Sequence, residues 1–387
     1  MLPPLTTSSF PTNLFSTPDL HSRSQIEGKA DVFLRPNHSS AVASKLIETA
    51  RELVYPRGKG IYATDETPEA IAVVLHDAAD EDVKQKQWTE DEERDRRRRW
   101  REAAYNAIPS EYISGVILFS ETLLDFHLAP LLSDRGIIVG IRANGELRPL
   151  PNSPEEFLVQ GQDNLLRDLQ AARAAGARFS KWRAPIACTA TGLPTEAGLD
   201  AHAETLAQYA AVSQEAGLVP VIEPDVEFKE DADLARSVEV HEWIIARIYA
   251  RCRAHGVLLE GTLLKPSFPQ PGLKHASRET VTAEQIALAT ATVIARSVPS
   301  AVAGVVFLSG GLAPSIATSY LAAVNALVNA APPESPFSRL PPLSFSFGRA
   351  LQGDAARHWV HGDDDKVKDT FEKWSRACWL AAQGKQA

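Results

Sequence analysis

A lysine follows a buried apolar run and directly precedes a proline in this 387-residue chain. The run from Leu258 to Leu264 predicts a buried strand, and Pro266 should end it because proline has no amide hydrogen. We therefore expect Lys265 where the strand meets its exit loop. Burial lowers the pKa of a lysine, and a neutral lysine amine forms Schiff bases with carbonyl compounds. The competing interpretation is a strand-end lysine that points into solvent.

Seven other short apolar runs also end in polar or charged residues. These residues are Asp65, Glu121, Arg142, Lys181 with Arg183, Glu223 with Asp225, Ser309 and Arg349. Alanine-rich, helix-compatible segments lie between most of the runs, at 164–175, 205–216, 234–254, 283–297 and 313–330. Eight strands alternating with helices predict an α/β fold, a single (β/α)8 TIM barrel. A doubly wound sheet is the alternative, but no G-x-G-x-x-G sequence opens a helix after the first strand.

The polar residues at the strand ends would meet at one rim of such a barrel, where barrel active sites lie. Lys181 and Lys265 would face the same mouth, and each positive charge disfavours protonation of the other lysine. Glu223 is then the expected acid and base for forming an iminium at a lysine. Asp65 could accept the proton of a hydroxyl group when the neighbouring carbon–carbon bond breaks.

Glycines follow the seventh and eighth runs, in Ser309-Gly310-Gly311 and Gly348-Arg349. In barrels the corresponding loops often bind phosphate through backbone amides, and an arginine adds charge-assisted hydrogen bonds. The alternative for each glycine is an ordinary tight turn.

Composition limits the kinds of partner and compartment. The net charge of −9 argues against nucleic acid as a partner, and no apolar run reaches membrane-spanning length. Three widely spaced cysteines, Cys188, Cys252 and Cys378, indicate a reducing compartment, so we expect a cytoplasmic protein. Residues 1–40 predict a flexible N-terminal extension, and residues 41–387 the barrel.

A densely charged segment precedes the second run. Residues 89–92 resemble a capping box, and the following basic residues from Arg94 to Arg101 continue the same predicted helix. Because acids immediately precede the basic run, we expect it to form a solvated helix face and not a nucleic-acid patch.

Taken together, the runs resemble class I fructose-bisphosphate aldolase. The resemblance extends in family order from about Val42 to Gln383. Its stretches are Gly58–Ile61 through Glu66, Gly115–Phe119 with Glu121–Leu123, Val139–Ile141, Lys181–Arg183, Val219-Pro220 with Glu223-Pro224, Leu259–Pro266, Phe307–Gly311, and Phe345-Ser346 with Gly348–Gln352.

The resemblance implies a metal-independent lyase of glycolysis that needs no cofactor, acts on a phosphorylated ketose and assembles as a homotetramer. It assigns the Schiff base to Lys265, acid–base work to Glu223, assistance at the carbinolamine to Lys181 and the C4 hydroxyl proton to Asp65. Arg183 matches the usual neighbour of Lys181. The resemblance assigns binding of the phosphate of dihydroxyacetone phosphate to Ser309, Gly310, Gly348 and Arg349.

Several positions depart from the family pattern. Arg142 replaces a lysine, Asp225 replaces a glutamate, and Ala70 and Val74 replace a serine and an arginine near the distal phosphate, whereas Thr67 keeps a hydroxyl. The sequence ends without the tyrosine-ended tail of the family, so the resemblance does not extend to tyrosine-assisted enamine protonation. We expect a Schiff-base aldolase with an altered acceptor aldehyde. The alternatives are a Schiff-base enzyme acting on another carbon–carbon or carbon–nitrogen bond, and a non-catalytic scaffold.

Overall fold

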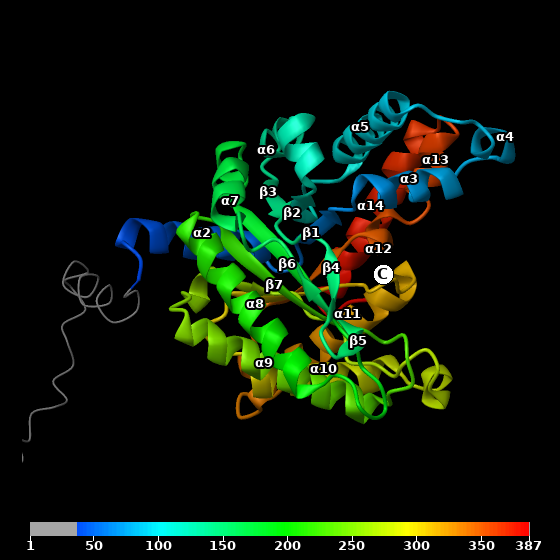
Figure 1. Cartoon of the computed structure of the whole chain (residues 1–387). Helices are drawn as coiled ribbons and strands as arrows, with labels where there is room; N and C mark the ends of the chain where they lie inside the picture. Colours follow the sequence, from blue (N-terminus) through cyan, green and yellow to red (C-terminus); the bar gives the residue numbers. More distant parts are fainter. Residues whose placement is uncertain (1–36, 387) are drawn as a thin grey trace, which may run out of the picture.

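A computed structural model describes residues 37–386 of the chain (Figure 1). The predicted extension, residues 1–40, lies outside the described residues except for its last four, so its flexibility stays a prediction. Among residues 37–386, no helix combines the length and the apolar character that a membrane crossing requires.

Eight parallel strands close into a barrel in the order β1-β10-β9-β8-β7-β6-β3-β2. Nearly every residue in these strands is buried, as expected of parallel strands covered by helices. The (β/α)8 prediction is confirmed, and the doubly wound alternative is excluded because the sheet has no free edge. The strands are β1 (Gly60–Thr64), β2 (Ile113–Leu118), β3 (Ile138–Arg142), β6 (Phe179–Ile186), β7 (Val219–Val226), β8 (Leu263–Leu264), β9 (Gly304–Phe307) and β10 (Leu343–Phe347).

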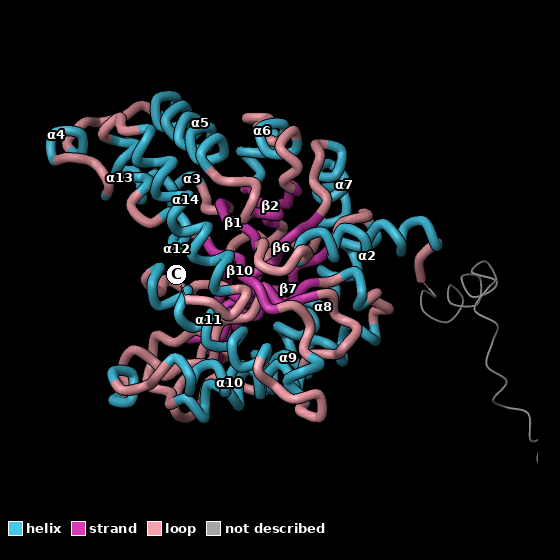
Figure 2. The backbone as a smooth tube through the Cα atoms, turned by 180° about the vertical axis from the view of Figure 1, so that it is seen from behind, coloured by secondary structure: helices cyan, strands magenta, loops and turns pink. Residues whose placement is uncertain are grey.

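Helices surround the strands (Figure 2). The predicted capping box at Thr89 with Glu92 is present, a second one joins Thr282 with Gln285, and each satisfies backbone amides at a helix start. The helices are α2 (Ser40–Val54), α3 (Pro68–Asp77), α4 (Glu81–Lys84), α5 (Glu90–Ala107), α6 (Pro130–Ser133), α7 (Leu165–Ala174), α8 (Glu196–Glu215), α9 (Leu234–Ala254), α10 (Ala283–Ser297), α11 (Pro314–Asn329), α12 (Arg349–Gln352), α13 (Ala355–Val360) and α14 (Asp364–Ala381).

Helix α2 closes the amino-terminal end of the barrel. Its apolar face, including Leu46 and Leu53, joins one buried cluster with strand residues such as Ile61 and Phe179. Gly304 at the start of β9 has no room for a side chain, because a Cβ there would lie 2.8 Å from Val54. This end is therefore an apolar plug, and polar groups are left to the opposite rim.

Two local features differ from the sequence predictions. Only Leu263–Leu264 of the predicted strand at residues 258–264 pairs as a strand, because Leu259–Gly261 forms a 3-10 turn that packs against α2. An antiparallel hairpin of β4 (Leu147–Leu150) and β5 (Ser153–Val159), which the run pattern did not predict, lies between β3 and β6.

Candidate active site

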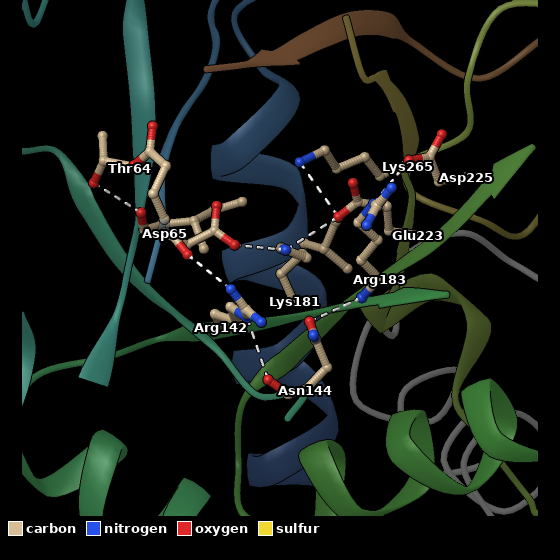
Figure 3. A network of polar contacts seen from close by, with 12 residues as sticks. Thr64, Asp65, Arg142, Asn144, Lys181, Arg183, Glu223, Asp225 and Lys265 are labelled. Carbon is tan, nitrogen blue, oxygen red and sulfur yellow. Dashed lines mark hydrogen bonds and ion pairs between the residues drawn. The ribbon is translucent and has the colours of Figure 1, made fainter. Parts of the chain in front are cut away.

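Four charged side chains meet in the mouth of the barrel, two from within β6 and β7 and two from the residues that directly follow β1 and β8 (Figure 3). The Nζ atom of Lys181 lies 2.6 Å from Asp65 Oδ2 and 3.3 Å from Glu223 Oε2. The Nζ atom of Lys265 lies 3.4 Å from the same Glu223 oxygen. The structure thus brings together all four residues that the sequence assigned to Schiff-base chemistry.

Strand register explains this arrangement. Arg142 in β3 lies beside Lys181 in β6, and Arg183 lies beside Glu223 in β7. The amide of Lys265 donates to the carbonyl of Ile222 (2.7 Å), which places the lysine one step beyond the short strand β8. Alternate residues of β6 and β7 therefore project toward the same mouth.

Burial and mutual charge determine the protonation of the cluster. Lys181, Lys265 and Glu223 are almost entirely buried. Burial lowers the pKa of Lys265; the nearby carboxylate of Glu223 opposes this effect, and the charge of Lys181 adds to it. Burial raises the pKa of Asp65, but Lys181 and Lys265 outweigh it and hold that pKa well below its usual range. The solvent-facing interpretation of Lys265 is therefore wrong, and burial makes the neutral form of this lysine more accessible than it is for an exposed lysine.

The β6–β7 side of the mouth holds a chain of ion pairs. Arg183 Nε donates to Asp225 Oδ2 (2.7 Å), and Arg183 Nη2 lies 3.5 Å from Glu227 Oε1. Lys229 Nζ lies 2.8 Å from the same Glu227 oxygen. Burial lowers the pKa of Arg183, but the carboxylates of Asp225, Glu223 and Glu227 together outweigh burial and raise it. The guanidinium of Arg183 is therefore held by protein carboxylates.

Arg142 at the end of β3 is held by backbone oxygens. Its Nη1 donates to the carbonyl of Asp65 and its Nε to that of Asn144, both at 3.2 Å. Its guanidinium also lies 5.6 Å from the centre of the Phe119 ring. Asn144 Oδ1 accepts a hydrogen bond from the Arg183 amide at 3.1 Å, so it links the two arginines (Figure 3).

The β9–β10 side is arranged differently. Gly310 and Gly311 adopt positive φ angles of 56° and 88°, which favour glycine. A Cβ at Gly311 would lie 3.0 Å from Nη2 of Arg349, so this guanidinium lies against the glycine turn. Gly348 approaches the Ala63 carbonyl so closely that a Cβ would lie 2.9 Å from it. Both glycine segments therefore need glycine for geometry, and Ser309 lies buried next to the first.

Within residues 37–386, neither the Gly310 and Gly311 amides nor the Arg349 guanidinium makes a hydrogen bond or ion pair with another described group. Consecutive unpaired amides beside an unpaired guanidinium form a suitable site for an anion. The predicted phosphate-binding residues thus lie together.

Thr67 and Glu121, which also lie at the barrel mouth, are bound to other groups of the protein. The hydroxyl of Thr67 caps α3 by accepting from the Ala70 amide (3.3 Å), so its predicted contact with substrate stays a prediction. Glu121 forms a two-point ion pair with Arg97 of α5, at 2.7 and 3.2 Å. Val74 packs against the core and Ala70 is exposed.

The expectation of a solvated basic face on α5 is wrong for Arg96, Arg97 and Arg101, which are buried. Arg101 Nη1 donates to Glu66 Oε2 at 2.9 Å, and Gln352 of α12 donates to Glu66 Oε1 at 3.1 Å. Glu66 thus joins α5 to α12, next to both Asp65 and Arg349. The sequence did not lead us to expect this link between α5 and α12, although the large aromatic Trp100 within the basic run indicated that one face of the helix is buried.

Within the described residues, no cluster of three or more histidine, cysteine or acidic side chains is suited to hold a metal ion. The ionisable groups of the mouth are instead amines, guanidiniums and carboxylates. Fold and site together define a barrel protein whose polar centre is a buried lysine.

The chain belongs to the class-I fructose-bisphosphate aldolase family, which is a family of lyases, because the family model matches residues 45–387. The predicted resemblance is therefore confirmed. Fructose-bisphosphate aldolase B of Bos taurus is 36% identical over 358 residues, covering 90% of this chain and 92% of the relative. Fructose-bisphosphate aldolase C of Homo sapiens is 36% identical over 359 residues, covering 90% and 93%. The solved fructose-bisphosphate aldolase of Plasmodium falciparum has a TM-score of 0.81 at 31% identity, covering 90% of this chain and 97% of that one.

Proposed function

We propose that this chain catalyses the reversible aldol cleavage of a ketose phosphate to dihydroxyacetone phosphate and an aldehyde, through a Schiff base at Lys265. The observation that carries the proposal is the contact of two buried lysines, Lys265 and Lys181, with one carboxylate, Glu223. Family membership supports the same reaction class. No metal ion is needed, because the iminium itself accepts the electron pair.

Formation of the Schiff base uses the lowered pKa of Lys265. With the shared proton of the Lys265–Glu223 pair on Glu223, the neutral amine attacks the ketone carbonyl, and a proton of the attacking nitrogen passes to the carbonyl oxygen. The resulting carbinolamine loses water when Glu223 delivers its proton to the departing hydroxyl, which leaves the iminium at Lys265. The ammonium of Lys181, 3.3 Å from Glu223, stabilises the carboxylate form after the proton has left.

Cleavage then uses Asp65. Its lowered pKa keeps the carboxylate ionised, so it can accept the proton of the C4 hydroxyl. The C3–C4 bond breaks, the C4 carbon becomes the aldehyde, and the bonding pair moves toward the iminium to give an enamine. Protonation of the enamine and hydrolysis of the iminium release dihydroxyacetone phosphate and regenerate Lys265.

The phosphate of the ketose is assigned to the unpaired groups of the β9–β10 side, Ser309, Gly310, Gly348 and Arg349. This assignment orients the chain of carbons across the mouth, with the carbonyl carbon at Lys265 and the carbons beyond C4 pointing toward β6 and β7.

Borohydride trapping tests the proposal. Dihydroxyacetone phosphate with borohydride should attach covalently to Lys265, as read by mass spectrometry of peptides, and should not attach to the Lys265→Met variant. Absence of any adduct on Lys265 of the folded protein would reject a Schiff-base enzyme and leave the scaffold alternative.

Assembly and compartment are further proposals. We infer a homotetramer in the cytoplasm, supported by family membership and by three cysteines that are buried and free among the described residues. Light scattering of the purified chain tests the tetramer, and a fluorescent fusion tests the compartment.

A further inference from the structure

Among the residues that the structure describes, the cations of the β6–β7 side of the mouth, Arg183 and Lys229, are both paired with carboxylates. Arg183 is bound by Asp225 and by Glu227, and Lys229 is bound by Glu227. The side chain of Arg183 is 38% exposed, so it reaches the mouth, but its charge is already neutralised by the two carboxylates. A second anion at Arg183 would therefore have to compete with two protein carboxylates for the same charge.

The surroundings add negative charge. A hollow of about 410 Å³ beyond the β6 and β7 ends is lined by Glu155, Glu230 and Asp231, with Lys274 as its one cation. Lys274 is itself paired with Glu230 at 2.6 Å. Like charges across a binding surface reject a ligand, so this side disfavours a phosphate dianion.

Helix α3 borders the mouth immediately after Asp65 and supplies no compensating charge. Its sequence contains no lysine or arginine, and its charged residues are Glu69 and Asp77. Ala70 and Val74 stand at the two α3 positions that the resemblance assigns to a distal phosphate, and neither side chain can bind an anion.

We propose that the aldehyde handled at the β6–β7 side carries no phosphate, and that Asp225 and Glu227 determine this preference by occupying Arg183. The substrate is then a ketose 1-phosphate, which splits into dihydroxyacetone phosphate and an uncharged aldehyde. This inference rests on the proposed aldolase function and deepens it by naming the acceptor class.

The condensation direction tests the inference directly. Purified enzyme is given dihydroxyacetone phosphate with glyceraldehyde, glycolaldehyde or propanal, and separately with glyceraldehyde 3-phosphate. At least one uncharged aldehyde should show a kcat/KM about tenfold or more above that of glyceraldehyde 3-phosphate.

Two variants test the residues. Glu227→Gln should remove one of the two carboxylates that neutralise Arg183 and raise kcat/KM for glyceraldehyde 3-phosphate relative to the best uncharged aldehyde, by about tenfold. Glu242→Gln removes a carboxylate of α9 that pairs with Arg296 on the outside of the barrel, and it should leave the ratio unchanged.

A wild-type preference for glyceraldehyde 3-phosphate overturns the inference, and so does trapping of dihydroxyacetone phosphate without condensation of any uncharged aldehyde. An unchanged ratio in Glu227→Gln overturns the role of Glu227. Failure of the proposed function is distinguishable, because then dihydroxyacetone phosphate is not trapped at Lys265 at all.

Discussion

Arg349 and Arg183 lie on two sides of the same barrel mouth in opposite surroundings. Arg349 lies against a glycine turn and has no partner within residues 37–386, whereas Arg183 is bound by Asp225 and Glu227. The difference shows that an arginine at a barrel rim indicates an anion site only when no protein carboxylate already neutralises it. One side can therefore anchor a phosphate while the other selects by rejecting one.

Removing Lys265 should abolish the reaction but leave the binding of ketose 1-phosphate in place. Lys265→Met should lower kcat by roughly ten-thousandfold or more, since no other neutral amine replaces the nucleophile. Ketose 1-phosphate should still bind, because its phosphate partners are intact. Isothermal titration and single-turnover assays measure the two effects; residual turnover within about a hundredfold of wild type would mean that another nucleophile serves.

Removing each arginine compares the two sides themselves. Arg349→Ala should lower kcat/KM for a ketose 1-phosphate by roughly several hundredfold, because charge-assisted hydrogen bonds to phosphate are lost. Arg183→Ala should change the same constant by less than about tenfold, because its charge is bound by protein carboxylates. Equal losses in steady-state assays would remove the distinction between the sides.

Removing the Glu66 side chain, which joins α5 to α12 next to Arg349, should lower the stability of the fold. Glu66→Ala leaves the Arg101 charge buried without its carboxylate and should lower the free energy of unfolding by about 3 kcal/mol. The matched control Glu48→Ala removes an exposed pair with Lys45 and should leave the free energy of unfolding nearly unchanged. Urea denaturation measures both, and a Glu66→Ala cost as small as the control would show that the link between α5 and α12 is not structural.

The reactivity of Lys265, which lies between the two sides of the mouth, should depend on pH through the charge of Lys181. Lys181 lowers the pKa of Lys265, so Lys181→Gln should raise it. Trapping requires the neutral amine, so the midpoint of its pH profile should move upward. Lys274→Gln, outside the cluster, should leave the midpoint in place. A downward shift in Lys181→Gln would contradict the assigned electrostatics.

The sequence predicted the barrel and its central residues because both follow from local patterns. Lys265 and Glu223 each end an apolar run, and parallel strands bring such ends to one rim. The pattern also located Gly311 and Arg349, since a glycine turn and an arginine at strand ends are visible without coordinates.

Pairings between distant residues could not be predicted in this way. Arg101 binds Glu66 across 35 positions, and nothing in the spacing of α5 indicated which of its arginines would turn inward. Glu227 lies beyond the polar end of its run, so its contact with Arg183 depends on how β7 continues past Asp225. The 3-10 turn before Lys265 arises from packing against α2, which overrides the strand preference of Leu259.

The plug formed by α2 has a consequence for the order of events. Leu46 and Leu53 close the amino-terminal end of the barrel, so the site opens only at the carboxyl-terminal mouth. Both fragments of a cleaved ketose must therefore leave by the route through which the ketose entered. The fragment joined to Lys265 stays until its iminium is hydrolysed. The aldehyde therefore departs first, so the covalent link to Lys265 sets the order of product release and the closed end sets the common route.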